Sequence, residues 1–224
     1  LLRIVLLKRF ESSSYALLAS IKKYQKRLKI FEDILLQENL LLNLSDIDDI
    51  LDEYEAEDGE NLDLTDDEIL EKARNLGKII SKDTHNMTAI IEDLDSEKKI
   101  LTAIIELTEQ FKNKDKKLEI FLKKVTDIAK NDPKRKILIF SFFADTVRYL
   151  KENVLRSAGN IFTAENTEFV SGRERANAIQ IAERFAPVAK DARERVTEKD
   201  ELTYLFSTDI LAEGQNLQDC GLLI

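Results

Sequence analysis

The sequence predicts an α/β protein in which a mainly helical region precedes a parallel sheet with helices. Apolar residues recur at intervals of three and four over residues 1–44 and 95–131, which is the spacing of amphipathic helices. After Pro133, short apolar runs alternate with amphipathic segments, as they do in parallel sheets. Only 6 Gly and 2 Pro occur in 224 residues, which argues against a turn-rich all-β fold.

Residues 1–44 are predicted to be helical with one break. Ser12-Ser13-Ser14 interrupts the apolar period and can cap a second helix. Lys and Arg side chains lie on the face opposite the apolar residues, where a solvated surface is the simplest interpretation.

The excess of acidic over basic residues lies in one block. Residues 46–71 carry 14 acidic and no basic side chains, although the net charge of the whole chain is only −9. The rest of the chain is therefore slightly basic, and the net charge does not exclude a nucleic-acid partner. The block lacks the spacing of a calcium-binding loop, so we expect a solvated insertion.

Two further helices are expected before the sheet. Thr65 and Glu68 have capping-box spacing, which favours a helix over 66–82. Residues 95–131 keep the helical period until Asn131-Asp132-Pro133 stops it.

The second half alternates strands and helices. The expected strands are 136–141, 202–207 and 222–224, with possible short strands at Asn160–Phe162 and Phe169–Val170. The expected helices are 144–157 and 173–185, and 208–218 is expected to be a loop or short helix.

Several chemistries are disfavoured by what the sequence lacks. It has no Gly-rich phosphate or dinucleotide loop and no Gly-x-Ser-x-Gly elbow. Cys220 is the single cysteine, which excludes an internal disulfide and a cysteine-cluster zinc site, and we expect a small core or rim role for it. His85 is the single histidine, lies in a charged region, and is expected to be structural or exposed. No apolar run reaches the roughly 18 residues that span a bilayer, so no membrane partner is expected.

Hydroxyl residues follow the two most apolar strands. Ser141 ends the first, and Ser207-Thr208 end the second. Ligands of open α/β sheets bind at the carboxyl ends of strands, where hydroxyl and backbone N–H groups suit phosphate oxygens. The same residues can instead merely cap the helices that follow, so the pattern alone leaves both interpretations open.

Four segments resemble the superfamily 2 helicases of the Swi/Snf type, in the bacterial branch related to RapA. Lys136–Leu150 resembles motif IV, and Phe206–Cys220 resembles motif V. Ser171-Gly172, with Arg175 and Arg184–Pro187, is similar to the next signature of the second RecA-like lobe. Leu6–Ser14 looks like the segment that leaves the first lobe.

The resemblance implies an ATP-dependent helicase or translocase, a hydrolase that moves along double-stranded DNA. It places nucleic-acid contacts at Ser141, Ser171, Gly172, Arg175 and Thr208. It also implies a cytoplasmic, nucleoid-associated bacterial protein.

The nucleotide cleft is implied at the last part of the chain. Glu213, Gly214, Gln215 and Asn216 would lie near that cleft and couple the lobes. ATP and Mg²⁺ belong to the full-length parent, because the phosphate loop, the acidic Mg²⁺-binding motif and the arginine of motif VI are missing here. No catalytic residue or metal ligand is expected in this chain, which alone should neither hydrolyse nor tightly bind ATP.

The resemblance divides the chain into three segments. Residues 1–36 would leave the first lobe, 37–94 would be an acidic helical insertion, and 95–224 a partial second RecA-like lobe. The insertion could dock a protein partner, shield DNA or act as a spacer. Phe142 departs from the family, which often has Gln there, and this puts polar contacts of that loop in doubt.

A non-enzymatic helical protein-interaction module with an α/β cap is the alternative interpretation. It accounts for the long amphipathic helices, but it gives no reason for the Phe206–Cys220 run. A nucleotide-binding regulatory domain is disfavoured because the Gly-rich phosphate loop is missing.

Overall fold

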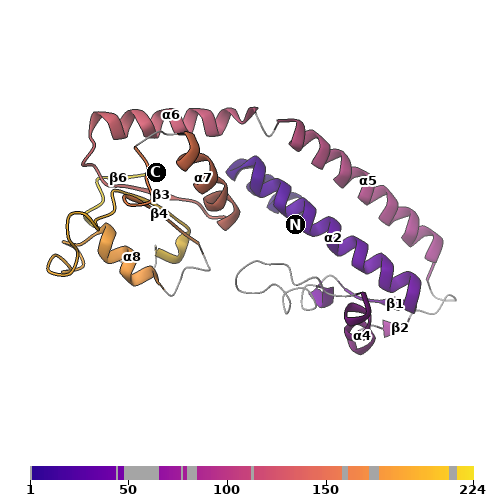
Figure 1. Ribbon diagram of the computed structural model, residues 1–224. Helices are drawn as coiled ribbons and strands as arrows, with labels where there is room; N and C mark the ends of the chain where they lie inside the picture. The colour runs from indigo at the N-terminus through magenta and orange to yellow at the C-terminus, as the bar shows by residue number, and fades with distance from the viewer. Residues whose placement is uncertain are drawn as a thin grey trace. The chain divides into compact units, whose positions relative to one another are not determined.

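The fold is α/β, mainly helical with one small parallel sheet, as predicted. The computed structural model describes residues 2–43, 45–47, 66–76, 78–79, 85–111, 114–157, 161–171, 177–211 and 216–224. The helices are α1 (Leu2–Ser12), α2 (Ser14–Glu38), α4 (Asp66–Leu76), α5 (Met87–Phe111), α6 (Lys116–Asn131), α7 (Ala144–Ser157) and α8 (Ala178–Phe185), with the 3₁₀ helix η3 (Asp209–Leu211). The strands are β1 (Leu40–Leu41), β2 (Lys78–Ile79), β3 (Ile137–Phe140), β4 (Thr167–Val170), β5 (Tyr204–Ser207) and β6 (Leu222–Leu223) (Figure 1).

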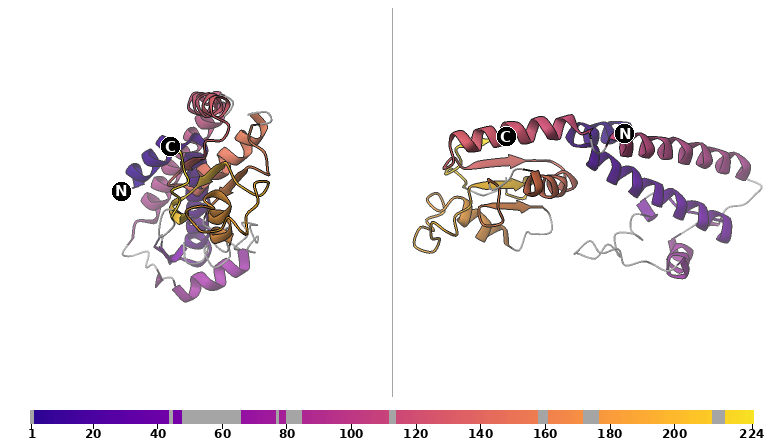
Figure 2. Two further views of the ribbon diagram at one scale, coloured as in Figure 1. Left: turned by 90° about the vertical axis from the view of Figure 1, so that its left-hand side faces the viewer. Right: turned by 45° about the horizontal axis from the view of Figure 1, so that its top comes forward.

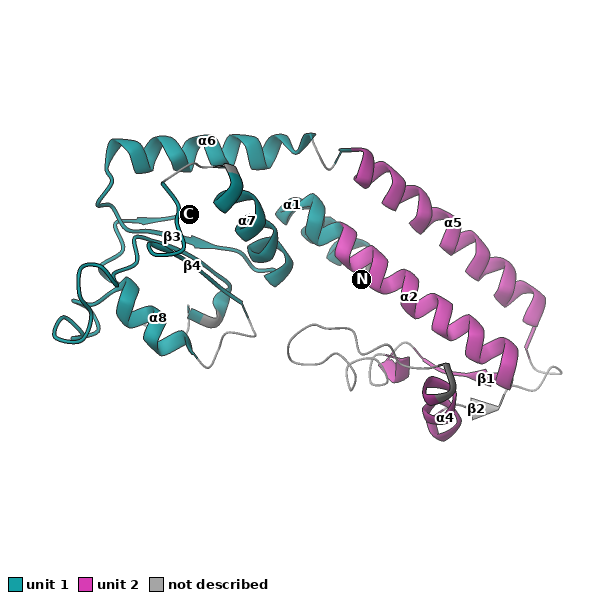
Figure 3. Cartoon of the chain, viewed as in Figure 1, with its two compact units in different colours: residues 1–17, 111–224 teal, residues 18–110 magenta. Residues whose placement is uncertain are grey.

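The chain forms two compact units. One comprises residues 1–17 and 111–224, and the other residues 18–110 (Figure 3). These bounds differ from the boundaries at 36 and 94 that the resemblance implied.

The unit of residues 18–110 is built on two long helices. Polar contacts join α2 to α5, including Tyr24 to Glu97 at 2.9 Å and Lys98 to Glu32 at 2.7 Å. One cluster of its buried residues comes from α2, α4 and the chain after α2: Ile30, Ile34, Leu40, Leu42, Ile47, Ile69 and Ala73.

Two expected helices have different ends in the structure. The helix expected over 66–82 ends at Leu76, because Lys78–Ile79 pairs with Leu40–Leu41 in an antiparallel ladder that the local period cannot reveal. The helix expected over 95–131 begins earlier and is two helices, α5 and α6. Asp115 starts the second as its N-cap, with Oδ1 accepting the Leu118 N–H at 3.0 Å. Thr65 of the expected capping box lies outside the described residues.

The break at the serine triplet is confirmed. α1 ends at Ser12 and α2 begins at Ser14. Ser13 lies between the two helices, where its hydroxyl accepts the Ala16 N–H at 3.0 Å and so caps α2.

The other unit is a three-layer sandwich around a parallel sheet. The strand order is β4-β5-β3-β6, and every neighbouring pair is parallel. Alternate residues of β3 face opposite sides. Ile137 and Ile139 pack with α6 and α7 on one side, and Leu138 packs with α8 on the other. The two helical layers lie on opposite sides of the sheet in Figures 1 and 2.

The expected strand at Asn160–Phe162 is wrong for its described part, since residues 161 and 162 are bends. The Asn166 side chain forms a turn instead, accepting the Thr163 N–H and donating to the Ile161 carbonyl, both at 2.9 Å. Phe162 packs into the core against Tyr204, with ring centroids 4.5 Å apart.

The remaining elements follow the predictions closely. Helix α7 has the expected bounds, and β4 begins two residues earlier than expected. Within 173–185 the described helix is α8, and within 208–218 it is η3. None of the described helices is long and apolar enough to span a bilayer.

Candidate functional site

Three hydroxyl residues meet at one edge of the sheet. Ser141, Ser171 and Thr208 directly follow β3, β4 and β5, which are adjacent and parallel. The backbone ladder continues through two of them, because Ser141 N donates to Ser207 O at 3.0 Å and Thr208 N donates to Val170 O at 3.1 Å. The structure therefore brings together the three hydroxyl positions that the sequence singled out.

The edge contains a topological switch point. After β3 the chain enters α7 on one face of the sheet, and after β5 it enters η3, whose Leu211 packs on the opposite face. Because β3 and β5 are neighbours, their outgoing connections diverge between Ser141 and Thr208. This divergence is where open α/β sheets hold ligands.

Thr208 carries an unsatisfied hydroxyl at this switch point. The residue is 4% exposed, and its buried Oγ1 has no hydrogen-bond partner within the described part of the chain. The neighbouring Ser207 hydroxyl, by contrast, donates to the Thr208 carbonyl at 2.7 Å. A buried hydroxyl without a partner costs about 1–3 kcal/mol, so its presence calls for an explanation.

Ser141 has a partly satisfied hydroxyl. Its Oγ accepts the Phe143 N–H at 3.3 Å and lies 3.3 Å from the Phe143 carbonyl and 3.4 Å from Ser12 Oγ. These are long distances for hydroxyl hydrogen bonds. The Ser141 hydroxyl thus stabilises the turn before α7 through weak bonds, since Phe143 precedes the helix.

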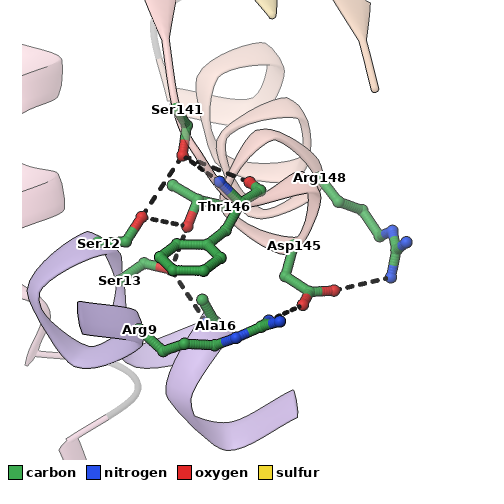
Figure 4. Close-up of polar contacts among 9 residues, drawn as sticks. Arg9, Ser12, Ser13, Ala16, Ser141, Asp145, Thr146 and Arg148 are labelled. Carbon is green, nitrogen blue, oxygen red and sulfur yellow. Dashed lines mark hydrogen bonds and ion pairs between the residues drawn. The ribbon is translucent and has the colours of Figure 1, made fainter. Parts of the chain in front are cut away.

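Residues from the start of the chain complete the site. Ser12 Oγ lies 2.8 Å from Thr146 Oγ1, and Ser13 Oγ lies 2.9 Å from the same atom (Figure 4). The sequence predicts a helix cap at the serine triplet, within a segment that resembles the exit from the first lobe, and it does not single out Thr146. No local sequence pattern reveals a contact between hydroxyl residues that lie more than 130 positions apart. The three consecutive serines beside a helix end are the one local feature that draws attention to the segment.

Charged and aromatic groups surround the hydroxyl cluster. Arg9 Nη1 is 2.8 Å from Asp145 Oδ2, and Arg148 Nη1 is 3.5 Å from Asp145 Oδ1. The Arg9 guanidinium also lies over the Phe143 ring, 4.6 Å from its centroid. Phe142, where the family often has Gln, is 80% exposed.

A cavity of about 350 Å³ adjoins the cluster. Ser12, Ser13, Ser141 and Thr146 line it on the polar side, together with Lys117. The rest of its wall is mainly apolar: Leu118, Phe121, Ile139, Phe140, Phe142, Tyr149, Leu150 and Ile224.

Asp115 joins three segments near this site. Its carboxylate caps α6 and accepts hydrogen bonds from Ser14 Oγ at 3.0 Å and from Tyr149 Oη at 3.2 Å. The Tyr149 ring stacks on Tyr15 with centroids 5.3 Å apart. Burial, reinforced by the charge and hydrogen bond of Asp115, raises the pKa of Tyr149 to about 12.

Of the other predicted site residues, the structure describes Asn216. Gly172, Arg175, Glu213, Gly214 and Gln215 lie outside the described residues. Asn216 is exposed and supports its turn, since Nδ2 donates to the Ala189 carbonyl at 3.4 Å and Oδ1 accepts the Gln218 N–H at 3.3 Å.

The single histidine and the single cysteine differ in burial. His85 is exposed, and Cys220 is half-buried, with Sγ 3.1 Å from the Leu222 carbonyl oxygen. Across the described ranges, no group of His, Cys, Asp and Glu side chains is arranged to hold a metal ion.

Comparisons of the chain with protein-family models, with curated proteins and with solved structures gave no match.

Proposed function

We propose that this chain is part of an ATP-driven translocase of the Swi/Snf type, and that its sheet is a partial RecA-like lobe whose edge contacts double-stranded DNA. The observation that carries the proposal is the Thr208 hydroxyl at the switch point between β3 and β5, which has no hydrogen-bond partner among the described residues. Thr208 also belongs to the Phe206–Cys220 run that resembles motif V.

The chemistry of the edge suits a phosphodiester backbone. A phosphate oxygen accepts hydrogen bonds, and the Thr208 hydroxyl has a donor that no described group uses. Because this hydroxyl is buried, a phosphate would reach it by displacing the groups that cover it. Ser141 and Ser171 directly follow the neighbouring strands, so hydroxyl residues follow three adjacent strands at about 4.8 Å intervals. Contacts of this kind position a protein on nucleic acid without reading its sequence.

ATP and Mg²⁺ enter the proposal only through the parent protein. They would supply the phosphoryl-transfer chemistry, which needs a lysine, Mg²⁺ and an arginine around the γ-phosphate. By the resemblance those groups lie outside this chain, which contributes DNA contacts and the coupling residues Glu213, Gly214, Gln215 and Asn216.

The test is a titration of fluorescein-labelled duplex DNA with the protein at several salt concentrations. Fluorescence anisotropy of the DNA measures the binding. Thr208→Val keeps the shape of the side chain and removes the hydroxyl. Thr203→Val is the matched control, because Thr203 directly precedes the same strand at its opposite end. We expect Thr208→Val to weaken binding about three- to tenfold, as the loss of one hydrogen bond to a charged group predicts, and Thr203→Val to leave it unchanged.

Equal binding by the two variants would contradict a DNA contact at Thr208. Binding that does not weaken with salt would contradict a phosphate interface altogether.

A protein-interaction module is the second candidate. Ile100 and Leu107 of α5 are 61% and 55% exposed and lie two helical turns apart on one face, as partner-binding positions do. Absence of duplex binding by every variant would favour this candidate.

A further inference from the structure

The junction of α1 and α2 covers the β3–α7 turn. We call residues 9–16 the α1–α2 corner. Within it, Ser12 and Ser13 contact Thr146, and Arg9 contacts Asp145, so the corner lies directly against the first turn of α7 (Figure 4). Ser13 and Thr146 are 5% and 7% exposed, which shows that this contact excludes water.

The hydroxyls of this contact satisfy one another. Each hydroxyl has a single hydrogen to donate. One consistent chain of donors runs from Ser13 through Thr146 and Ser12 to Ser141, and ends on the Phe143 carbonyl. In that arrangement every hydroxyl hydrogen is used inside the protein, and Ser141 has none left for an external oxygen.

The charges of the contact are satisfied internally too. The first turn of a helix favours an anion, because its N–H groups lack partners within the helix. Asp145 supplies that anion at the start of α7, and its carboxylate engages both Arg9 and Arg148. An external phosphate at this place would compete with Asp145 for the same two guanidinium groups.

We propose that the α1–α2 corner is an intrachain cap, which competes with the phosphate backbone of DNA for Ser141 and the first turn of α7. This inference rests on the proposed function. The bonds at Ser141 are long, and the Arg9 and Asp145 side chains are 28% and 24% exposed, so a polyanion can displace the cap reversibly. The corner thereby sets the affinity of the sheet edge for DNA.

The cap is tested by opening it and measuring duplex-DNA affinity by anisotropy. Ser12→Ala combined with Ser13→Ala removes the corner hydroxyls without changing charge. We expect it to bind about three- to tenfold more tightly than the wild type, because one or two internal hydrogen bonds no longer oppose opening. Ser96→Ala is the control, since the Ser96 hydroxyl donates to the Glu92 carbonyl of its own helix.

A second variant opens the cap from the charged side. Arg9→Gln breaks the pair with Asp145, and Arg3→Gln makes the same charge change at an exposed position of the same helix. A cap predicts about two- to fivefold tighter binding for Arg9→Gln despite its lost positive charge, and no gain for Arg3→Gln.

Hydrogen exchange separates a cap from a shared binding site. Saturating duplex DNA should increase amide exchange over residues 9–16 while it protects β3. Two results would overturn the cap and leave the DNA interface intact. One is protection of both segments by DNA, and the other is DNA binding by the corner variants that is no tighter than that of the wild type. No duplex binding by the wild type and by both opened variants would overturn the cap and the proposed function together.

Discussion

The pair of Lys136 and Glu201 gives the sharpest stability prediction. Lys136 Nζ, at the start of β3, lies 2.5 Å from Glu201 Oε1 and donates to the Phe185 carbonyl at 2.5 Å. Arg193 holds the other carboxylate oxygen at 2.9 Å. The Lys136 and Glu201 side chains are only 12% and 17% exposed, so water replaces a lost partner only in part.

We expect Glu201→Gln to destabilise the folded chain by about 2 kcal/mol. Removing one partner of a fully buried ion pair costs about 3–5 kcal/mol, whereas exposed pairs contribute about 0–1 kcal/mol. Glutamine keeps the volume and one oxygen for Lys136, which places the cost between these limits. A change of this size lowers the melting temperature by roughly 4–8 °C in a chain of this length.

Glu119→Gln is the matched control. The Lys116–Glu119 pair has nearly the same length, 2.6 Å, but its side chains are 77% and 67% exposed. Calorimetric melting of both variants therefore separates burial from distance. Equal shifts for the two variants would refute the reasoning that burial decides the strength of the pair.

The same variant has a defined pH dependence. Burial alone would raise the pKa of Glu201, but the hydrogen bonds and charges of Lys136 and Arg193 outweigh it and lower the pKa below 4.5. The carboxylate stabilises the fold above the pKa of the unfolded state, and this contribution is lost as pH falls through the folded pKa. The melting difference between wild type and Glu201→Gln should be full at neutral pH and shrink below about pH 4.5.

Two further predictions concern the hydroxyl groups near the sheet edge. Because Tyr149 titrates near 12 rather than 10, it should stabilise the fold below pH 10 and lose this contribution between pH 10 and 12. Spectrophotometric titration of wild type and Tyr149→Phe checks this, and a normal phenol titration would contradict it. Thr208→Val should raise the melting temperature by roughly 2–4 °C, because it removes a buried hydroxyl for which the described residues offer no partner. A lower melting temperature would show that the hydroxyl has a stabilising partner.

Part of the candidate site was predictable because its signals are local. The continuous apolar runs of β3 and β5, which are buried over nearly their whole length, identified the strands, and hydroxyl residues directly after them identified the edge. Parallel pairing then brings Ser141 and Thr208 to the same edge. The predicted roles in binding DNA stay predictions.

Other parts depend on partners remote in the sequence. The single helix expected over 95–131 is broken where Asp115 caps α6 and also binds Ser14 and Tyr149. The helical period has no information about such partners, because apolar spacing continues across the break.

The sequence by itself determined the α/β class, the core strands, helix α7 and the break at the serine triplet, because each depends on the spacing of neighbouring side chains. Tertiary structure alone decided the strand order, the switch point and the contact between Ser12 and Thr146, which are 134 positions apart. These features arise when distant segments bury their apolar faces together, and no local pattern specifies which hydroxyls then meet.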